Sequence, residues 1–160
     1  MSKTLVTYFS ASGVTAKIAE QISEAIGADL HEIRPKVSYT QADLDWRDEN
    51  ARSTVEMKNK SIRPEIAEDK ISIAEYDTVF VGFPIWWYVA PTIINTFLEA
   101  HDFSGKTVVI FATSGGSRFG KTADELKVSL TDDAKLVEWD ILNDSYTNKE
   151  LADMVEKLGL

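Results

Sequence analysis

Cysteine is absent from this sequence of 160 residues. The chain therefore has no disulfide, no cysteine-ligated zinc or iron–sulfur cluster and no thiol nucleophile. Any redox chemistry would depend on a bound cofactor. Histidine is scarce as well, and we expect the two histidines, His31 and His101, to be structural or surface residues. We expect neither a catalytic residue nor a metal site.

Basic residues are outnumbered, with 17 Lys and Arg against 26 Asp and Glu, and the formal net charge is -9. Nucleic acid and anionic membranes repel such a surface, so we expect neither as a partner and consider basic proteins better candidates. The sequence also lacks an 18-residue apolar run and the features of a signal peptide. These absences predict a cytoplasmic protein, and the length predicts a single domain over residues 1–160.

Five short segments are rich in β-branched and aromatic residues, which is typical of strands. The three most apolar are continuous rather than alternating, as strands buried on both faces require. The expected strands are Thr4 to Phe9, Leu30 to Arg34, Thr78 to Phe83, Thr107 to Ala112 and Lys135 to Trp139.

Helical patterns lie between these segments. Apolar residues recur at helical spacing in Ile18, Ile22 and Ile26 ahead of Gly27, in Ile94, Phe97 and Leu98 after Pro91, and in Leu44, Ala51 and Val55, which share a face with Asp48. Two pairs have the spacing of a capping box, namely Thr122 with Glu125 and Thr147 with Glu150. The alternation of strands and helices predicts an α/β fold: a parallel sheet with helices on both faces and a ligand site at the carboxyl ends of the strands.

The turn after the first strand is rich in hydroxyl groups and begins a helix. Its candidate binding residues are Ser10, Ser12, Gly13, Val14 and Thr15. Hydroxyls, free N–H groups and the positive end of a helix dipole together can bind a phosphate. The alternative is a plain serine cap with a flexible glycine. A dinucleotide fingerprint is excluded because it needs three glycines.

Two further turns follow the third and fourth strands. The first of them carries three consecutive aromatic residues and comprises Pro84, Ile85, Trp86, Trp87 and Tyr88. Aromatic rings at this edge suit stacking on a planar ligand, or else they cover the core or form a dimer contact. The other turn comprises Thr113, Ser114, Gly115, Gly116 and Ser117. Its backbone can approach a heterocycle closely, or it is simply a tight turn.

Taken together, these three turns resemble those of the short-chain flavodoxins, and the resemblance covers essentially the whole chain. It implies a three-layer α/β/α fold with strand order 2-1-3-4-5 and FMN as the cofactor. It further implies that the first turn binds the FMN phosphate, that Trp86 stacks on the flavin, and that the third turn holds the pyrimidine side of the flavin.

The sequence departs from that family in two places. The third turn has no second aromatic residue to sandwich the flavin, and Phe119 is the nearest one. Trp87 and Tyr88 also occupy the stretch where the family commonly has a glycine whose peptide bonds the reduced ring. We therefore expect no strong stabilisation of the half-reduced flavin.

A competing motif overlaps the third turn. Residues 115–122 match G-x-x-x-x-G-K-[ST], the phosphate loop of many nucleotide hydrolases, with Lys121 as its lysine. Such a hydrolase needs further strands and a magnesium-binding aspartate, for which Asp140 is a weak substitute. A phosphate-accepting receiver domain is excluded, because Phe83 and Pro84 stand where its aspartate would be.

The favoured function is a low-potential electron carrier that docks on basic redox partners such as a flavodoxin reductase, as a monomer or weak dimer. The alternative is an NAD(P)H-dependent FMN oxidoreductase acting on quinones or nitro compounds. Arg118 lies either near the flavin pyrimidine or exposed in the first turn of a helix. The connection over residues 37–52 either covers the flavin or is a solvated helix with Trp46 packed inward.

Overall fold

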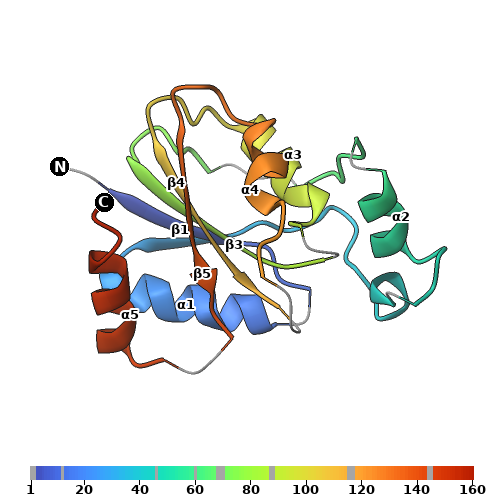
Figure 1. Ribbon diagram of the computed structural model, residues 1–160, viewed down its shortest axis with the longest axis horizontal. Coiled ribbons are helices and arrows are strands. Elements are labelled where there is room, and N and C mark those ends of the chain that lie inside the picture. Colours follow the sequence, from blue (N-terminus) through green and yellow to red (C-terminus); the bar gives the residue numbers. More distant parts are fainter. Residues whose placement is uncertain are drawn as a thin grey trace.

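The central sheet of the computed structural model has five parallel strands in the order β2-β1-β3-β4-β5, as predicted (Figure 1). The strands are β1 (Thr4–Tyr8), β2 (Asp29–Glu32), β3 (Thr78–Pro84), β4 (Thr107–Thr113) and β5 (Lys135–Ile141). The structure describes residues 3–11, 13–45, 47–59, 61–67, 71–86, 89–114, 118–143 and 146–160.

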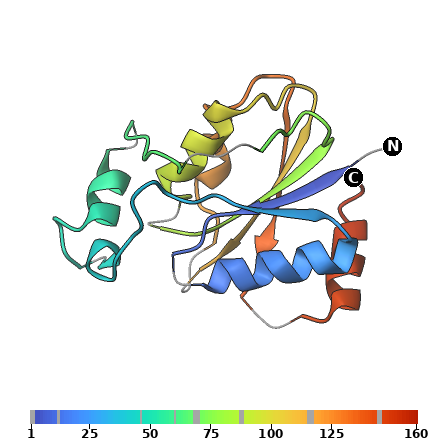
Figure 2. The ribbon, with the colours of Figure 1, turned by 180° about the vertical axis from the view of Figure 1, so that it is seen from behind.

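Helices cover both faces of the sheet (Figures 1 and 2). One face carries α1 (Val14–Ile26) and α5 (Asn148–Glu156), and the other carries α3 (Thr92–Ala100) and α4 (Thr122–Lys127). Two smaller elements, the 3-10 helix η1 (Ala42–Leu44) and α2 (Arg52–Lys58), stand apart from these layers, beyond the carboxyl ends of the strands. The fold is therefore the expected α/β/α arrangement with an added lobe, residues 35–67, at the ligand edge.

Successive residues of each central strand pack into opposite cores, which is why the strand sequences are apolar throughout. Leu5 and Val79 contribute to the core under α3 and α4. Val6 and Phe80 contribute to the core under α1 and α5. Their side chains are at most 1% exposed, which confirms the prediction that these strands are buried on both faces.

The single helix expected across Leu44 to Val55 is wrong, because the chain forms the separate elements η1 and α2 there. The Asp45 and Asp48 carboxylates accept hydrogen bonds from the N–H groups of Arg47 and Asn50, at 3.1 and 2.9 Å. Such local bonds give the backbone an alternative to helix. The apolar pattern was misleading for a second reason. Val55, one of the three apolar residues that predicted a buried helix face, is 46% exposed.

The two capping predictions had different outcomes. Thr147 caps α5 with a complete capping box, because its side chain accepts the N–H of Glu150 and the Glu150 carboxylate accepts the N–H of Thr147. The predicted cap at Thr122 is wrong. Lys121 is the N-cap of α4, and the buried Thr122 hydroxyl instead donates to the carbonyl of Phe119.

Other helix ends follow the sequence closely. Gly27 ends α1 in the left-handed conformation, with φ 66°, as predicted. Pro91 is the N-cap of α3, one residue ahead of the first helical position expected for it. The second and fifth strands begin and end within two residues of the predicted bounds. The predicted strand residues Ile33 and Arg34 lie just after β2.

Candidate functional site at the carboxyl edge of the sheet

The three predicted binding turns follow β1, β3 and β4, which are neighbours in the sheet. Hydrogen bonds join all three at Thr113, the last residue of β4. Its hydroxyl lies 2.8 Å from the hydroxyl of Thr15, and its carbonyl accepts the N–H of Ile85 at 2.8 Å. Turns 98 and 28 residues apart in sequence therefore form one continuous edge.

The first turn presents the N-terminus of α1. Gly13 is the N-cap, and its φ of 93° is accessible chiefly to glycine. Its N–H donates to the Ser10 hydroxyl oxygen at 3.0 Å, which closes the turn. The first turn of α1 has no acidic residue, so the positive end of the helix dipole is not neutralised there. Ser12 lies outside the described residues.

Thr15 and Val14 have opposite environments at the start of α1. Thr15 is 1% exposed, whereas Val14 is 51% exposed. A hydroxyl can donate one hydrogen bond and accept two. If Thr113 donates, the Thr15 hydroxyl still has its own proton for a ligand. With Thr113 as the donor, the contact orders the edge and leaves the Thr15 hydroxyl proton for a ligand.

The second turn is a short reversal held at Trp86. The N–H of Trp86 donates to the Val89 carbonyl at 2.9 Å, and the N–H of Val89 donates back at 3.2 Å. The Trp86 ring packs edge-to-face on Phe9 and Tyr39, with centroid distances of 5.8 and 5.5 Å. Of the other residues predicted here, Pro84 ends β3 and Ile85 follows it, while Trp87 and Tyr88 lie outside the described residues.

The third turn is held by a residue that sequence reasoning missed, Asn143. Its side-chain oxygen accepts the N–H of Ser114 at 2.9 Å, and its side-chain nitrogen donates to the Ser114 carbonyl at 2.7 Å. The available signal was its position, since Asn143 follows β5 and reaches the same edge of the sheet. Gly115, Gly116 and Ser117 lie outside the described residues.

Tyr39 connects the lobe of residues 35–67 to this edge. Its hydroxyl donates to the buried carboxylate of Glu56 at 2.5 Å, and Arg52 donates to the other oxygen of Glu56 at 3.0 Å. The Arg52 guanidinium also lies 3.8 Å from the centroid of the Tyr39 ring. Burial, together with the hydrogen bond to Glu56, raises the pKa of Tyr39 well above its ordinary value.

The contact of Tyr39 with Trp86 bears on the role of the connection over residues 37–52. The part that carries Tyr39 packs against the predicted binding edge, which agrees with the alternative of a covering segment rather than a fully solvated helix. Trp46, which the alternative of a solvated helix would pack inward, lies outside the described residues.

The residues of the competing phosphate-loop motif have other roles in the described part. Arg118 pairs with Asp140 at 2.8 Å, so the aspartate considered for magnesium is in an ion pair. Arg118 is exposed, as one of its two expected placements has it, but it lies ahead of α4 rather than in the first turn of that helix. Of the strands in the described ranges, only β5 follows this turn. His101 packs on Phe97 with a centroid distance of 4.9 Å, as a structural residue would.

Every helix formed by the described residues is too short or too polar to span a lipid bilayer.

Solved structures with the same fold include flavin proteins. A candidate flavoprotein from Bacteroides eggerthii DSM 20697 is 47% identical, with a TM-score of 0.92 over 100% of this chain and 99% of that one. A flavoprotein from Lactobacillus acidophilus NCFM, solved in complex with FMN, is 27% identical, with a TM-score of 0.66 over 86% of this chain and 91% of that one.

A curated relative and a family model extend these comparisons. The uncharacterized NAD(P)H oxidoreductase YcaK of Escherichia coli strain K12 is 30% identical over 92 residues, which is 54% of this chain. The match spans 44% of YcaK, less than half of its length. The family model described as flavodoxin matches residues 3–158. With the strand order and the three joined turns, this match establishes that the chain belongs to the flavodoxin family.

Proposed function

We propose that this protein binds FMN at the carboxyl edge of its sheet and acts as an electron carrier. The observation that carries the proposal is the meeting of three binding turns at Thr113. It places a hydroxyl-rich helix N-terminus and an aromatic residue, Trp86, on one edge. The solved relative from Lactobacillus acidophilus in complex with FMN supports the choice of cofactor.

The phosphate end of FMN fits the first turn. The donor set comprises the hydroxyls of Ser10, Ser12 and Thr15 and the first N–H groups of α1. No acidic side chain in the first turn of α1 opposes an anion. Lys17, one turn into α1, adds a positive charge on the same helix. Charge-assisted bonds from such donors are stronger than bonds between neutral groups.

The ring end of FMN fits the second and third turns. Trp86 offers an aromatic ring for stacking, and Phe9 and Tyr39 fix its orientation through edge-to-face contacts. Backbone groups of the turn over residues 113–117 would face the pyrimidine side. Bound FMN would supply the redox centre of a chain that has no cysteine. The protein's own contribution is binding, orientation and partial exclusion of water from the ring.

The carrier function rests on charge. The net charge of -9 favours docking on a basic reductase and disfavours anionic surfaces. The same charge opposes full reduction of the cofactor, because reduction adds negative charge to a ring beside apolar side chains. A strongly reducing cofactor suits one-electron delivery to a cytoplasmic partner.

A second candidate function is an NAD(P)H-dependent oxidoreductase that acts on quinones or nitro compounds. The observation that favours it is the similarity over 92 residues to YcaK, which is named as an NAD(P)H oxidoreductase. Such an enzyme needs a place for the nicotinamide nucleotide and a substrate pocket open to the flavin.

The test combines two measurements on purified protein reconstituted with FMN. Stepwise anaerobic reduction followed by visible spectroscopy reports whether flavin is bound and how it takes up electrons. Steady-state oxidation of NADH or NADPH with a quinone and no added reductase then separates the two functions. A carrier shows negligible turnover until a reductase is added. Substantial turnover without it would favour the enzyme, and failure to bind any flavin would refute both.

A further inference from the structure

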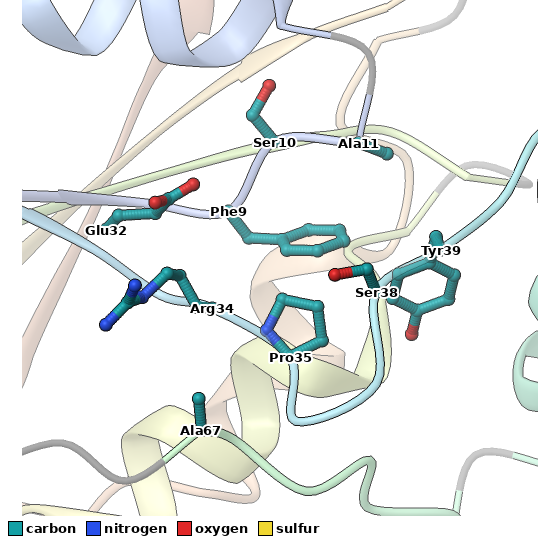
Figure 3. A pocket seen from close by; sticks show the side chains of 9 residues that line it. All are labelled: Phe9, Ser10, Ala11, Glu32, Arg34, Pro35, Ser38, Tyr39 and Ala67. Carbon is teal, nitrogen blue, oxygen red and sulfur yellow. The ribbon is translucent and has the colours of Figure 1, made fainter.

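A pocket of about 480 Å³ lies beside the first turn, on the side of β1 that faces β2 (Figure 3). Its volume falls in the range of small-molecule sites. Phe9 and Tyr39 line one part of it with aromatic rings, and Glu32 and Arg34 line the opposite part with charged groups. Ser10 belongs both to this pocket and to the proposed phosphate turn.

Backbone hydrogen bonds hold the walls of this pocket in place. The N–H of Ile33 donates to the Tyr8 carbonyl at 2.6 Å, which ties the chain after β2 to β1. The Arg34 carbonyl then accepts the N–H of Ala67 at 2.8 Å, where the lobe returns to the sheet. The pocket is therefore built at the neck of the lobe and is largely formed before a ligand arrives.

The charged side chains of the pocket are available to a ligand. The other four arginines, Arg47, Arg52, Arg63 and Arg118, each pair with a carboxylate. Among the described residues the Arg34 guanidinium has no such partner, and the Glu32 carboxylate has neither an ion pair nor a hydrogen bond. A guanidinium with five free donors is suited to phosphate, and a carboxylate with free lone pairs is suited to hydroxyl groups.

The position of Glu32 is similar to one that meets ribose hydroxyls in a different α/β fold. In dinucleotide-binding folds, whose three-glycine turn this chain lacks, an acidic residue about 20 residues after the phosphate turn accepts from the ribose 2′-hydroxyl. In the same folds a nearby arginine accommodates a phosphate on that hydroxyl. Glu32 is the last residue of β2 and stands 19 positions after Gly13.

We infer that this pocket is a binding site for an adenosine phosphate group. The purine would lie against Tyr39, the ribose hydroxyls would donate to Glu32, and a phosphate would accept from Arg34. Two sources carry this group: the adenosine half of FAD, whose flavin half would occupy the proposed FMN site, and the adenosine end of NAD(P)H. The inference rests on the proposed function only for the location of the flavin phosphate.

The first experiment tests the pocket without flavin. Isothermal titration of the flavin-free protein with AMP, ADP and adenosine 2′,5′-bisphosphate should show saturable binding. Arg34→Ala should weaken that binding about tenfold or more, because a charge-assisted contact is lost. Arg47→Ala, which removes an exposed arginine of the lobe, is the matched control and should leave it unchanged.

Glu32→Gln probes the ribose in the same titrations. It should weaken adenosine ligands while sparing inorganic phosphate, whereas Glu138→Gln, at an exposed position of β5, should change neither. Equal effects of Arg34→Ala and Arg47→Ala, or no saturable binding of any adenosine ligand, would overturn the inference.

A second experiment distinguishes the two sources. If FAD is the source, the flavin-free protein binds FAD more tightly than FMN, and Arg34→Ala abolishes the difference. If NAD(P)H is the source, FAD has no advantage, and the FMN-loaded protein binds NADPH in a manner that depends on Arg34. Either result supports the pocket. FMN binding by Arg34→Ala is measured as well. If its affinity for FMN is unchanged, the adenosine pocket and the proposed FMN site are separate, and each proposal can fail without the other.

Discussion

Gly82, within β3, lies against the ring of buried Phe111 in the neighbouring strand. A Cβ atom at residue 82 would stand 2.3 Å from the ring's Cζ atom. Phe111 has no room to withdraw, since it is fully buried and packs edge-to-face with Trp139. This glycine is therefore required by packing and not by an unusual backbone angle.

Gly82→Ala should lower the free energy of unfolding by about 1 to 3 kcal/mol, the usual cost of overpacking a core. Urea unfolding monitored by tryptophan fluorescence would measure it. The double variant Gly82→Ala/Phe111→Leu should lose less than the sum of the two single losses, because leucine makes room for the added methyl. Strict additivity would show that the close approach has no energetic consequence.

At the proposed FMN site, Thr15 is the residue whose role is easiest to isolate. Thr15→Ala should weaken FMN binding by about ten- to a hundredfold, since a hydroxyl donor to a charged group is worth about 1.5 to 3 kcal/mol. Riboflavin, which lacks the phosphate, should lose much less affinity. Fluorescence titration of the flavin-free protein with both ligands makes the comparison.

Two controls accompany that measurement. Thr15→Ser keeps the hydroxyl and should retain the preference for FMN. Lys121→Ala changes the lysine of the competing phosphate-loop motif and should leave FMN binding unchanged. Equal losses of FMN and riboflavin in Thr15→Ala would remove Thr15 from the phosphate site. Magnesium-dependent ATP binding that Lys121→Ala abolishes would revive the hydrolase alternative.

At the scale of elements, one hydrogen bond joins the chain entering β3 to the start of β2. The Tyr76 hydroxyl donates to the Asp29 carboxylate at 2.6 Å. That bond, reinforced by burial, raises the pKa of Tyr76 to about 12. The contact ties the edge strand β2 to the sheet at the end opposite the proposed ligand site.

Tyr76→Phe should lower stability at neutral pH by about 1.5 kcal/mol, through loss of a hydrogen bond to a carboxylate. Because folding raises the tyrosine pKa, the contribution of the bond is complete below pH 10 and declines as the pH rises toward 12. The stability difference between wild type and Tyr76→Phe, measured by urea unfolding at several pH values, should therefore shrink above pH 10. A difference that stays constant to pH 12 would contradict this assignment.

The lobe of residues 35–67 contains the helix that was predicted wrongly, across Leu44 to Val55, and shows why that prediction failed. The helical pattern of Leu44, Ala51 and Val55 was weak, and two aspartates in the intervening segment bond to nearby backbone N–H groups instead. Two contacts stabilise α2: the pair of Arg52 with Glu56 four residues later in the same helix, and the hydrogen bond from the distant Tyr39 to the buried Glu56 carboxylate. No local pattern indicates that a glutamate will be the buried member of a helix.

At the scale of the molecule, the two ends of the sheet differ in their roles. The first and last described residues lie at the amino edge, and the lobe extends beyond the carboxyl edge, where the proposed FMN site is (Figure 1). Partner docking should therefore depend on charge at the lobe more than on charge near the chain ends.

A basic reductase should associate quickly at low salt and markedly more slowly at high salt, because its approach is steered by charge. Glu49→Lys, in the lobe, should slow association several-fold at low ionic strength. Glu156→Lys, at the end of α5, makes the same change of charge far from the site and should have a smaller effect. Stopped-flow measurement of flavin reduction provides the rates. Equal effects of the two variants would assign the steering to net charge alone.

The sequence by itself determined the strands, the covering helices α1, α3 and α5, and the edge at which the binding turns meet. Those features depend on local apolar patterns and on the rule that parallel strands end together. Only the tertiary structure decided that Asn143 holds Ser114, that Tyr39 packs on Trp86, and that Arg34 is left unpaired in a pocket. Each of these depends on residues distant in the chain, whose contacts follow from packing rather than from any local pattern of residues.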